Sequence, residues 1–441
     1  MRKATKWMAL PMVTVLAVGS LSACSSSGTQ KAADGGKAAP AKVNLKMIES
    51  LTSPARTEVI KKMIASFEAA NPNIKVELIS PPLEGADNKI STMLNAREDL
   101  DVLEVRDVTV KQFVTNKWIA DLSSYTNAWS GYKDLNANAI AMANYINNTP
   151  YFIPYGLYEK MLFYRKDWFD AKGLTPPKTW DELYKDAKAL TDPANNRFGY
   201  SFRGGSGADG YIVDLLRDFN GSNVNPDDAM FLKSGATIFS TPEAKQGLTM
   251  YANLYKDGSP KDSVNWAFAE QVQGFVSGTT AMLIQDPDTI DPVSQKLGQG
   301  TWATAPMPVG PTGISHYKVG AAGWGVTSYS KHPNEAWKLI EFLSSPEQNA
   351  IFTKTAGVIP IHNSASVDKS FTQGAYKPYI DMANDPAHFV SYKPETDYKG
   401  FGEWRKIVQQ DMQAVLLNHL SIDDALKKWD AYWINEKKQG K

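Results

Sequence analysis

Residues 43–105 alternate between strand-like and helix-like segments, and this alternation constrains the fold more than any other feature of the chain. Residues 43–48 form a short, mostly apolar run that predicts a strand. Ser53 and Pro54 suit the first positions of a helix, which ends before Pro72. A strand at 74–78, a helix at about 87–96 and a strand at 101–105 follow. This order predicts an α/β layered domain with largely parallel strand pairing.

A second region of regular structure starts near residue 161. Thr179 and Glu182 have the spacing of a capping box, in which each side chain bonds the other residue's backbone amide. Residues 281–284 form an apolar run that predicts a buried strand. These features indicate that the second region also mixes helices with strands.

The last part of the chain is predicted to be mainly helical. Residues 345–348 resemble a second capping box, and Gly357 is expected to end the helix that follows it. Residues 404–437 are predicted to be helical. Within them Leu426, Trp429 and Trp433 share one face and are expected to lie in the core.

Length and composition narrow the class of protein. A chain of 441 residues, 43% of them hydrophobic, is expected to form two lobes or domains. Its 47 basic and 47 acidic residues give a formal net charge of zero, which argues against a nucleic-acid binder. The single cysteine, Cys24, excludes a disulfide framework and cysteine-based zinc or iron–sulfur sites.

Residues 1–23 are predicted to be an export signal, with a basic start followed by a short apolar run. The segment Leu-Ser-Ala-Cys that ends at Cys24 resembles the lipobox of bacterial lipoproteins. That resemblance implies cleavage before Cys24 and attachment of a lipid to its sulfur. An ordinary signal peptide with an incidental cysteine is the alternative.

Residues 24–42 are predicted to be a lipidated cysteine and a flexible tether, because small and polar residues cannot bury a core. Acyl chains at Cys24 would hold the globular part at the outer face of a cell membrane. No later segment of the sequence is expected to form a transmembrane helix. We therefore predict a lipid-anchored extracellular protein of the Gram-positive type.

Several segments, taken in order, resemble the family 1 extracellular solute-binding proteins of ABC importers, the group that includes maltose-binding protein. The most specific match is LFYRKD followed by PPKTWDEL, at 162–167 and 176–183. The other matching segments are FEAANPNIKV at 67–76, FVSGTTAM at 275–282, AWKLIEFL at 336–343 and GVIP at 357–360. The resemblance covers about residues 21–435.

The resemblance implies two α/β lobes of the periplasmic-binding-protein type, joined by three hinge crossings, that close over a solute. The crossings would fall near 156–157, 320–322 and 357–358, where glycines tolerate changes in backbone angles, although ordinary loops also contain glycine. The implied first lobe comprises 43–157 and 321–357, and the second comprises 158–320 and 358–441.

Enzyme motifs are absent from the sequence. The five histidines lack the spacing of a metal site, and neither a nucleophile elbow nor a phosphate-binding loop occurs. We expect no enzyme activity, no metal and no cofactor. A lipid-anchored glycan hydrolase is the alternative from another class, because its two carboxylates need no recognisable spacing.

A cleft that binds a neutral sugar needs aromatic faces and polar hydrogen-bonding groups. Tyr158 and Glu159 lie at the first expected crossing, where hinge packing is the alternative role. Arg106 and Asp107 follow a predicted strand, where open α/β sheets bind ligands, although a solvated loop pair is equally compatible.

The remaining candidates are two carboxylates and three tryptophans. Asp286 and Asp288 stand where many relatives have Gly and Trp, which favours polar recognition over stacking. Trp266, Trp324 and Trp404 are candidate aromatic platforms, with the helix core as the alternative for Trp404. Trp324 and Trp404 are expected to stack on the sugar, while Glu159 and Asp286 accept its hydroxyls.

These observations predict a monomeric solute-binding lipoprotein. It would capture a carbohydrate, namely an oligosaccharide, and deliver it to the permease subunits of an ABC importer. Its partners would be the carbohydrate, the permease and the membrane, and not nucleic acid. A non-sugar solute on the same scaffold, such as a polyol phosphate or a polyamine, is the alternative.

Overall fold

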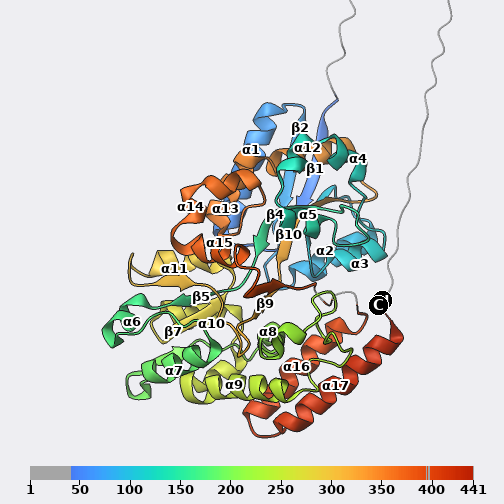
Figure 1. Cartoon of the computed structure of the whole chain (residues 1–441). Helices are drawn as coiled ribbons and strands as arrows, with labels where there is room; N and C mark the ends of the chain where they lie inside the picture. The colour runs from blue at the N-terminus through green and yellow to red at the C-terminus, as the bar shows by residue number, and fades with distance from the viewer. Residues whose placement is uncertain (1–40, 394, 396–397, 441) are drawn as a thin grey trace, which may run out of the picture. The chain divides into compact units, whose positions relative to one another are not determined.

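Two separate β-sheets organise the computed structural model, which describes residues 41–393, 395 and 398–440. The first sheet has the strand order β2-β1-β3-β10-β4, and the second has the order β6-β7-β5-β8. Each sheet lies in its own cluster of buried hydrophobic residues. We call the two assemblies the first and second lobes (Figure 1). The predicted α/β fold with two lobes is therefore confirmed.

The first lobe begins with the predicted alternation of strands and helices. Its strands are β1 (Val43–Ile48), β2 (Ile74–Ile79), β3 (Val102–Arg106), β4 (Ile153–Tyr158) and β10 (Gly320–Val326). β1 pairs in parallel with β2 and β3, as predicted, whereas β10 pairs antiparallel with β3 and β4. The parallel pairing therefore holds for only part of this sheet.

The glycine-rich strand β10 lies inside the first sheet, between β3 and β4. A Cβ atom at Gly323 would lie 2.0 Å from the carbonyl oxygen of Ile153, so a larger residue could not approach β4 as closely. The pairing register shifts between Ala322 and Gly323, which marks a local irregularity. Close backbone approach therefore explains the glycine at this position.

Helices cover both sides of the first sheet (Figure 1). They are α1 (Pro54–Ala70), α2 (Ala86–Ala96), α3 (Val110–Thr115), α4 (Ser123–Ala128), α5 (Ala137–Ala143), α12 (Pro333–Leu343) and α13 (Pro346–Ala356). Ser53 caps α1 as predicted, because its side chain accepts a hydrogen bond from the Arg56 amide. Ser345 caps α13 in the same way, and Gly357 ends α13 in the left-handed conformation.

The second lobe is built on a smaller, mixed sheet. Its strands are β5 (Met161–Tyr164), β6 (Phe198–Tyr200), β7 (Thr280–Gln285) and β8 (Ala303–Ala305). β7 is buried along its whole length, as the apolar run predicted. A separate parallel pair joins β9 (Ser315–Tyr317) to β11 (Phe389–Ser391).

The helices of the second lobe surround its sheet. They are α6 (Lys166–Lys172), α7 (Trp180–Leu190), α8 (Ala208–Asn220), α9 (Pro242–Gly258), α10 (Phe268–Val276), α11 (Ile290–Lys296), α15 (Lys377–Ala383), α16 (Phe401–Leu416) and α17 (Ile422–Gln439). The capping box of Thr179 and Glu182 is present at the start of α7. The helical tail predicted over 404–437 is interrupted, because the chain turns at Asn418, where φ is 60°.

Trp429 and Trp433 are fully buried and Leu426 is nearly so, which confirms that this face of α17 lies in the core.

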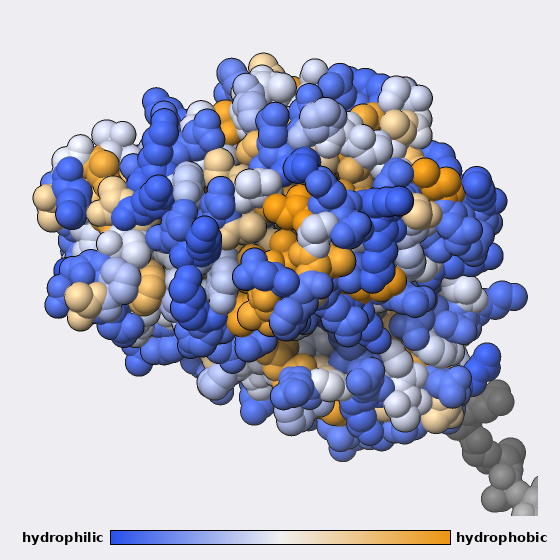
Figure 2. All heavy atoms as spheres, turned by 90° about the horizontal axis from the view of Figure 1, so that it is seen from below, coloured by the Kyte–Doolittle hydropathy of each residue, from blue (hydrophilic) through white to orange (hydrophobic). Residues whose placement is uncertain are grey.

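The surface of the second lobe seen in Figure 2 is largely hydrophilic, with hydrophobic residues gathered near its middle. Amphipathic helices that bury one face and expose the other account for the hydrophilic part of this surface.

Short segments complete the described chain. Helix α14 (Lys369–Thr372) precedes α15, and the 3₁₀ turns are η1 (Ser130–Asp134), η2 (Pro193–Asn195), η3 (Gly221–Asn223), η4 (Lys261–Asn265), η5 (Pro287–Thr289), η6 (Asn363–Val367) and η7 (Gly374–Tyr376). Within the described ranges, no helix is both long and apolar enough to span a membrane. The predicted signal, Cys24 and most of the tether lie outside the described residues.

The chain passes from the first sheet to the second between β4 and β5, and returns to the first sheet at β10. Leu157 in β4 and Ile359 after α13 bond each other's backbone, with N–O distances of 2.9 and 3.1 Å. These connections lie near the three predicted crossings. The lobe boundaries and the hinge role of these segments stay predictions.

Candidate functional site

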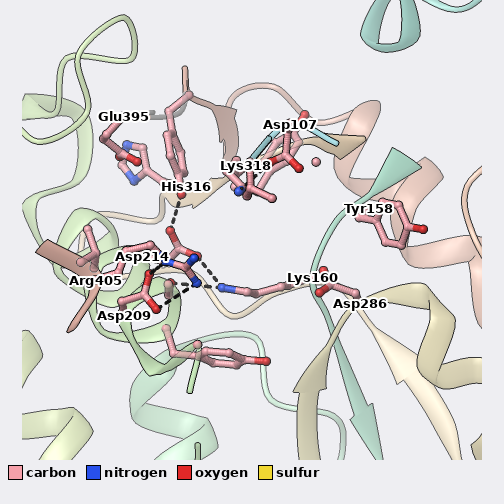
Figure 3. A pocket seen from close by; sticks show the side chains of 18 of the residues that line it. Asp107, Tyr158, Lys160, Asp209, Asp214, Asp286, His316, Lys318, Glu395 and Arg405 are labelled. Carbon is pink, nitrogen blue, oxygen red and sulfur yellow. Dashed lines mark hydrogen bonds and ion pairs between the residues drawn. The ribbon is translucent and has the colours of Figure 1, made fainter. Parts of the chain in front are cut away.

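A cavity of about 340 Å³ has walls from both lobes (Figure 3). The first lobe contributes the ends of β3 and β4 and the start of β10, and the second lobe contributes α8, η5 and α16. The charged lining residues are Arg106, Asp107, Lys160, Arg203, Asp209, Asp214, Arg217, Asp286, Asp288, Lys318, Glu395 and Arg405. Tyrosines Tyr158, Tyr211, Tyr317 and Tyr392 also line it. We call this cavity the cleft.

An ion-pair network forms one wall of the cleft. Lys160 reaches from the β4–β5 connection to Asp214 on α8, with 2.9 Å between Nζ and Oδ2 (Figure 3). Arg217, one helical turn further along α8, pairs with the other oxygen of Asp214 at 2.8 Å and also with Glu395. Burial alone would raise the pKa of Asp214, but Lys160 and Arg217 lower it below its usual value. This wall is therefore held in place by charges that neutralise one another.

Further ion pairs join segments that are distant in the sequence. Lys318 Nζ lies 3.0 Å from Asp107 Oδ2, and Arg405 Nε lies 2.8 Å from Asp209 Oδ2. Arg106 pairs with Asp87. These contacts orient the rim of the cleft from both lobes.

Asp286 and Asp288 differ from the other acids of the cleft. In the described part of the chain, neither carboxylate has an ion pair, and Oδ1 of Asp288 is buried without a hydrogen-bond partner. Burial raises the pKa of Asp286, and burial with the nearby Asp286 charge raises the pKa of Asp288 to about 7. Both groups follow the buried strand β7, so the fold fixes them at a sheet end. They are available to exchange hydrogen bonds with a polar solute.

The structure brings six of the nine predicted binding residues together in the cleft. They are Arg106, Asp107, Tyr158, Asp286, Asp288 and Trp404. Glu159, Trp266 and Trp324 do not line it. The roles of the six in solute binding stay predictions.

Trp324 lies in the core of the first lobe rather than in the cleft. It is 2% exposed on the central strand β10, and its ring centroid lies 5.1 Å from that of Tyr155. The expectation that it stacks on a sugar assumed an open glycine-rich loop, whereas its neighbours in space come from the flanking strand. Trp404 borders the cleft, but it is 1% exposed and packs against Trp429 and Trp433.

Glu159 points away from Tyr158 and lines a different cavity. Trp266 lies in a hollow beside α10, where Nε1 donates a hydrogen bond to Asp262 Oδ2 at 3.1 Å. Tyr158 and Lys160 face the cleft while Glu159 does not, which is the alternation of an extended chain. That period was visible in the sequence and could have identified Lys160.

Other cleft residues gave no signal in the sequence. Asp209 and Asp214 lie on α8, and in the sequence they cannot be distinguished from the polar residues of any amphipathic helix. Lys318 comes from the short segment between β9 and β10. Tertiary contacts, and not local patterns, bring these residues to the cleft. Among the described residues, no group of three or more His, Cys, Asp or Glu side chains is arranged to hold a metal ion.

Residues 50–350 match the family model of the bacterial extracellular solute-binding proteins. The match covers more than half of the chain and includes segments of both lobes. The chain belongs to this family. Proteins of the family bind solutes for ABC transporters and are not enzymes.

Known relatives of this solute-binding protein match most of its length. A protein of Brucella abortus (strain 2308) that carries the name of a binding protein is 25% identical over 384 residues, covering 84% of this chain and 87% of its own. Maltose-bound MalE3 of T. maritima has a TM-score of 0.76 at 22% identity and covers 88% of this chain and 98% of its own. An ABC substrate-binding protein of Listeria monocytogenes in complex with cycloalternan has a TM-score of 0.73 at 20% identity. It covers 91% of this chain and 100% of its own. The structural likenesses confirm the fold.

Two buried carboxyl groups should make the stability of this solute-binding protein fall as the pH rises. Burial and the Asp286 charge raise the pKa of Glu159 to about 8, and the pKa of Asp288 is raised to about 7. Both groups titrate near pH 4 in an unfolded chain, so between about pH 4 and 8 the folded protein binds more protons. The free energy of unfolding therefore decreases through this window.

We expect urea unfolding to give a free energy lower by up to about 6 kcal/mol at pH 8 than at pH 5, since one pKa unit corresponds to about 1.4 kcal/mol. Glu159→Gln should flatten this slope, because the amide does not titrate. A stability that rises between these two pH values, or a slope that Glu159→Gln leaves unchanged, would contradict the assignment.

Proposed function

We propose that this solute-binding protein captures a carbohydrate in the cleft, namely an oligosaccharide, and delivers it to the permease of an ABC importer. The observation that carries the proposal is a cleft with walls from both lobes, in which Asp286 and Asp288 have no ion pair within the described residues. Sugar hydroxyls can donate to such carboxylates, and the tyrosines offer rings for the apolar sugar face. The relatives solved with maltose and with cycloalternan support this class of solute.

A thermal-shift screen over mono- and oligosaccharides tests the proposal. A ligand that binds only the folded state stabilises it by about 2.7 kcal/mol at a hundred times its Kd. We expect at least one saccharide to raise the melting temperature, and mass spectrometry should find that saccharide unchanged after incubation. Cleavage of the saccharide would instead support the hydrolase alternative.

A charged small solute is the second candidate. The cleft carries six acidic and six basic side chains, more than a neutral sugar requires. Most of them pair with one another, which favours the neutral solute. The screen should therefore include polyol phosphates and polyamines, and stabilisation by one of these without any saccharide response would favour the second candidate.

We also propose that a lipid on Cys24 anchors the protein at the outer face of the membrane. Cys24 is the only cysteine of the chain and follows Leu-Ser-Ala, although it lies outside the described residues. Two acyl chains are sufficient for stable anchoring. This anchor would keep the solute-binding lobes close to the permease.

Cys24→Ala should move most of the protein from the membrane fraction to the soluble fraction, because no lipid can be attached. The measurement is quantitative blotting of both fractions from cells that express the parent or the variant. Ser25→Ala is the matched control and should stay with the membrane. Retention of Cys24→Ala in the membrane fraction would refute the anchor.

A further inference from the structure

A second cavity, of about 290 Å³, lies on the other side of the β4–β5 connection from the cleft. Tyr158 lines the cleft, whereas the next residue, Glu159, lines this second cavity. We call it the rear cavity. Its other lining residues are Asn136, Ala137, Asn138, Leu157, Ile359, Pro360, His362, Asn363, Ala365, Phe371, Tyr376, Tyr379, Ile380 and Ala383.

Both lobes enclose the rear cavity. The start of α5 comes from the first lobe, and η7 and α15 come from the second. Leu157 and Ile359, whose backbones are hydrogen-bonded to each other, form the wall between them. Apolar and aromatic side chains make up most of the lining, so the cavity is suited to a ligand that is largely apolar.

Among the described residues, two polar side chains of the rear cavity have no hydrogen-bond partner. Glu159 is 5% exposed, and the described part of the chain supplies neither a hydrogen bond nor an ion pair to its carboxylate. Tyr379 is 3% exposed, and its hydroxyl has no hydrogen-bond partner there. Buried polar groups are normally satisfied, so unpartnered ones that line a cavity make it a candidate binding site.

Three aromatic rings line the rear cavity together with Glu159. Phe371, Tyr376 and Tyr379 form a continuous series, with centroid distances of 5.3 and 6.4 Å. The Lys354 ammonium lies 5.8 Å from the centroid of the Phe371 ring. The rings of Tyr376 and Tyr379 are therefore the ones that can contact a bound ligand. No Lys or Arg lines the cavity within the described residues. Asp286, Glu159 and Asp288 add to burial in raising the pKa of Tyr379, so acidic groups lie near this ring.

We propose that the rear cavity binds a small organic cation with an apolar body, such as an alkylammonium ion. Burial and the Asp286 charge raise the pKa of Glu159 to about 8, so a bound cation would displace the proton of this carboxyl group to solvent. The resulting carboxylate would supply the counter-charge, and the faces of Tyr376 and Tyr379 would attract the cation through their π-electrons. An anion would meet an unpaired carboxylate, and an oligosaccharide would leave most hydroxyls without partners. This site is separate from the cleft, so it does not depend on the solute bound there.

Calorimetry with choline and 3,3-dimethylbutan-1-ol tests the proposal, since these probes share a shape and differ in charge. At pH 9, above the pKa of about 8 of Glu159, the full chain should bind choline at least tenfold more tightly than the neutral alcohol. Glu159→Gln, which removes the counter-charge, and Tyr379→Leu, which removes a ring, should each weaken choline binding at least tenfold. Glu58→Gln removes an exposed carboxylate from α1 and should have no effect.

Circular dichroism and thermal unfolding would establish that each variant is folded before its binding is interpreted. If Tyr379→Leu does not fold, Tyr379→Phe keeps the ring and Glu159→Gln still tests the charge. Equal binding of choline and the alcohol would overturn the proposal, as would absence of choline binding at 10 mM. Choline binding that survives Glu159→Gln unchanged would also overturn it.

Discussion

Trp404→Ala should lower the free energy of unfolding by about 3–5 kcal/mol, the usual cost of removing a large buried aromatic side chain. Trp404 is 1% exposed, and its ring centroid lies 5.3 Å from that of Phe239, 5.9 Å from Trp429 and 5.5 Å from Trp433. These contacts join α16 and α17 to the rest of the second lobe. Urea unfolding of the parent and the variant measures the effect.

Trp266→Ala is the matched control, because the side chain of Trp266 is only partly buried beside α10. Its removal should cost less than half as much as the loss of Trp404. A Trp404→Ala variant that keeps the parent's stability and loses only solute affinity would contradict this account. It would support instead the stacking role predicted from the sequence.

Arg217→Met should be similarly destabilising, by about 3–5 kcal/mol, because it leaves the buried Glu395 carboxylate without its counter-charge and Asp214 with Lys160 alone. Arg217 is 1% exposed, bonds the Ala229 carbonyl through Nε at 3.0 Å and pairs with Asp214 and Glu395. Its guanidinium also lies 4.0 Å from the centroid of the Tyr392 ring. Chemical unfolding at pH 7 measures the loss.

A second substitution separates the charge effect from simple loss of packing. Adding Glu395→Gln to Arg217→Met should recover part of the stability, because the unpaired buried charge of Glu395 is removed. Lys166→Met, which breaks an exposed pair with Asp170 on α6, should change stability by less than about 0.5 kcal/mol. No recovery in the double variant would show that the ion pair is not the source of the effect.

Local patterns in the sequence predicted the start of the first lobe well. The strand at 43–48 and the capped helix after Ser53 are present as expected, because their caps and apolar spacing act locally. The capping box at Thr179 and the buried face of α17 are confirmed for the same reason. These features depend on residues within a few positions of one another.

Features that depend on distant contacts were not predictable in the same way. Strand β10 has the composition of a loop. Its close approach to Ile153 in β4 explains Gly323, and its place between β3 and β4 explains the burial of Trp324. The ion pairs of Lys318 with Asp107 and of Arg405 with Asp209 join residues about two hundred positions apart. Sequence spacing carries no information about such pairs.

Calorimetry on one substitution from each lobe tests most directly whether the cleft is the solute site. With the saccharide found in the screen, Asp107→Asn in the first lobe and Asp286→Asn in the second should each weaken binding at least tenfold. This corresponds to about 1.4 kcal/mol or more. Binding within twofold of the parent in both folded variants would contradict a solute held between the two lobes.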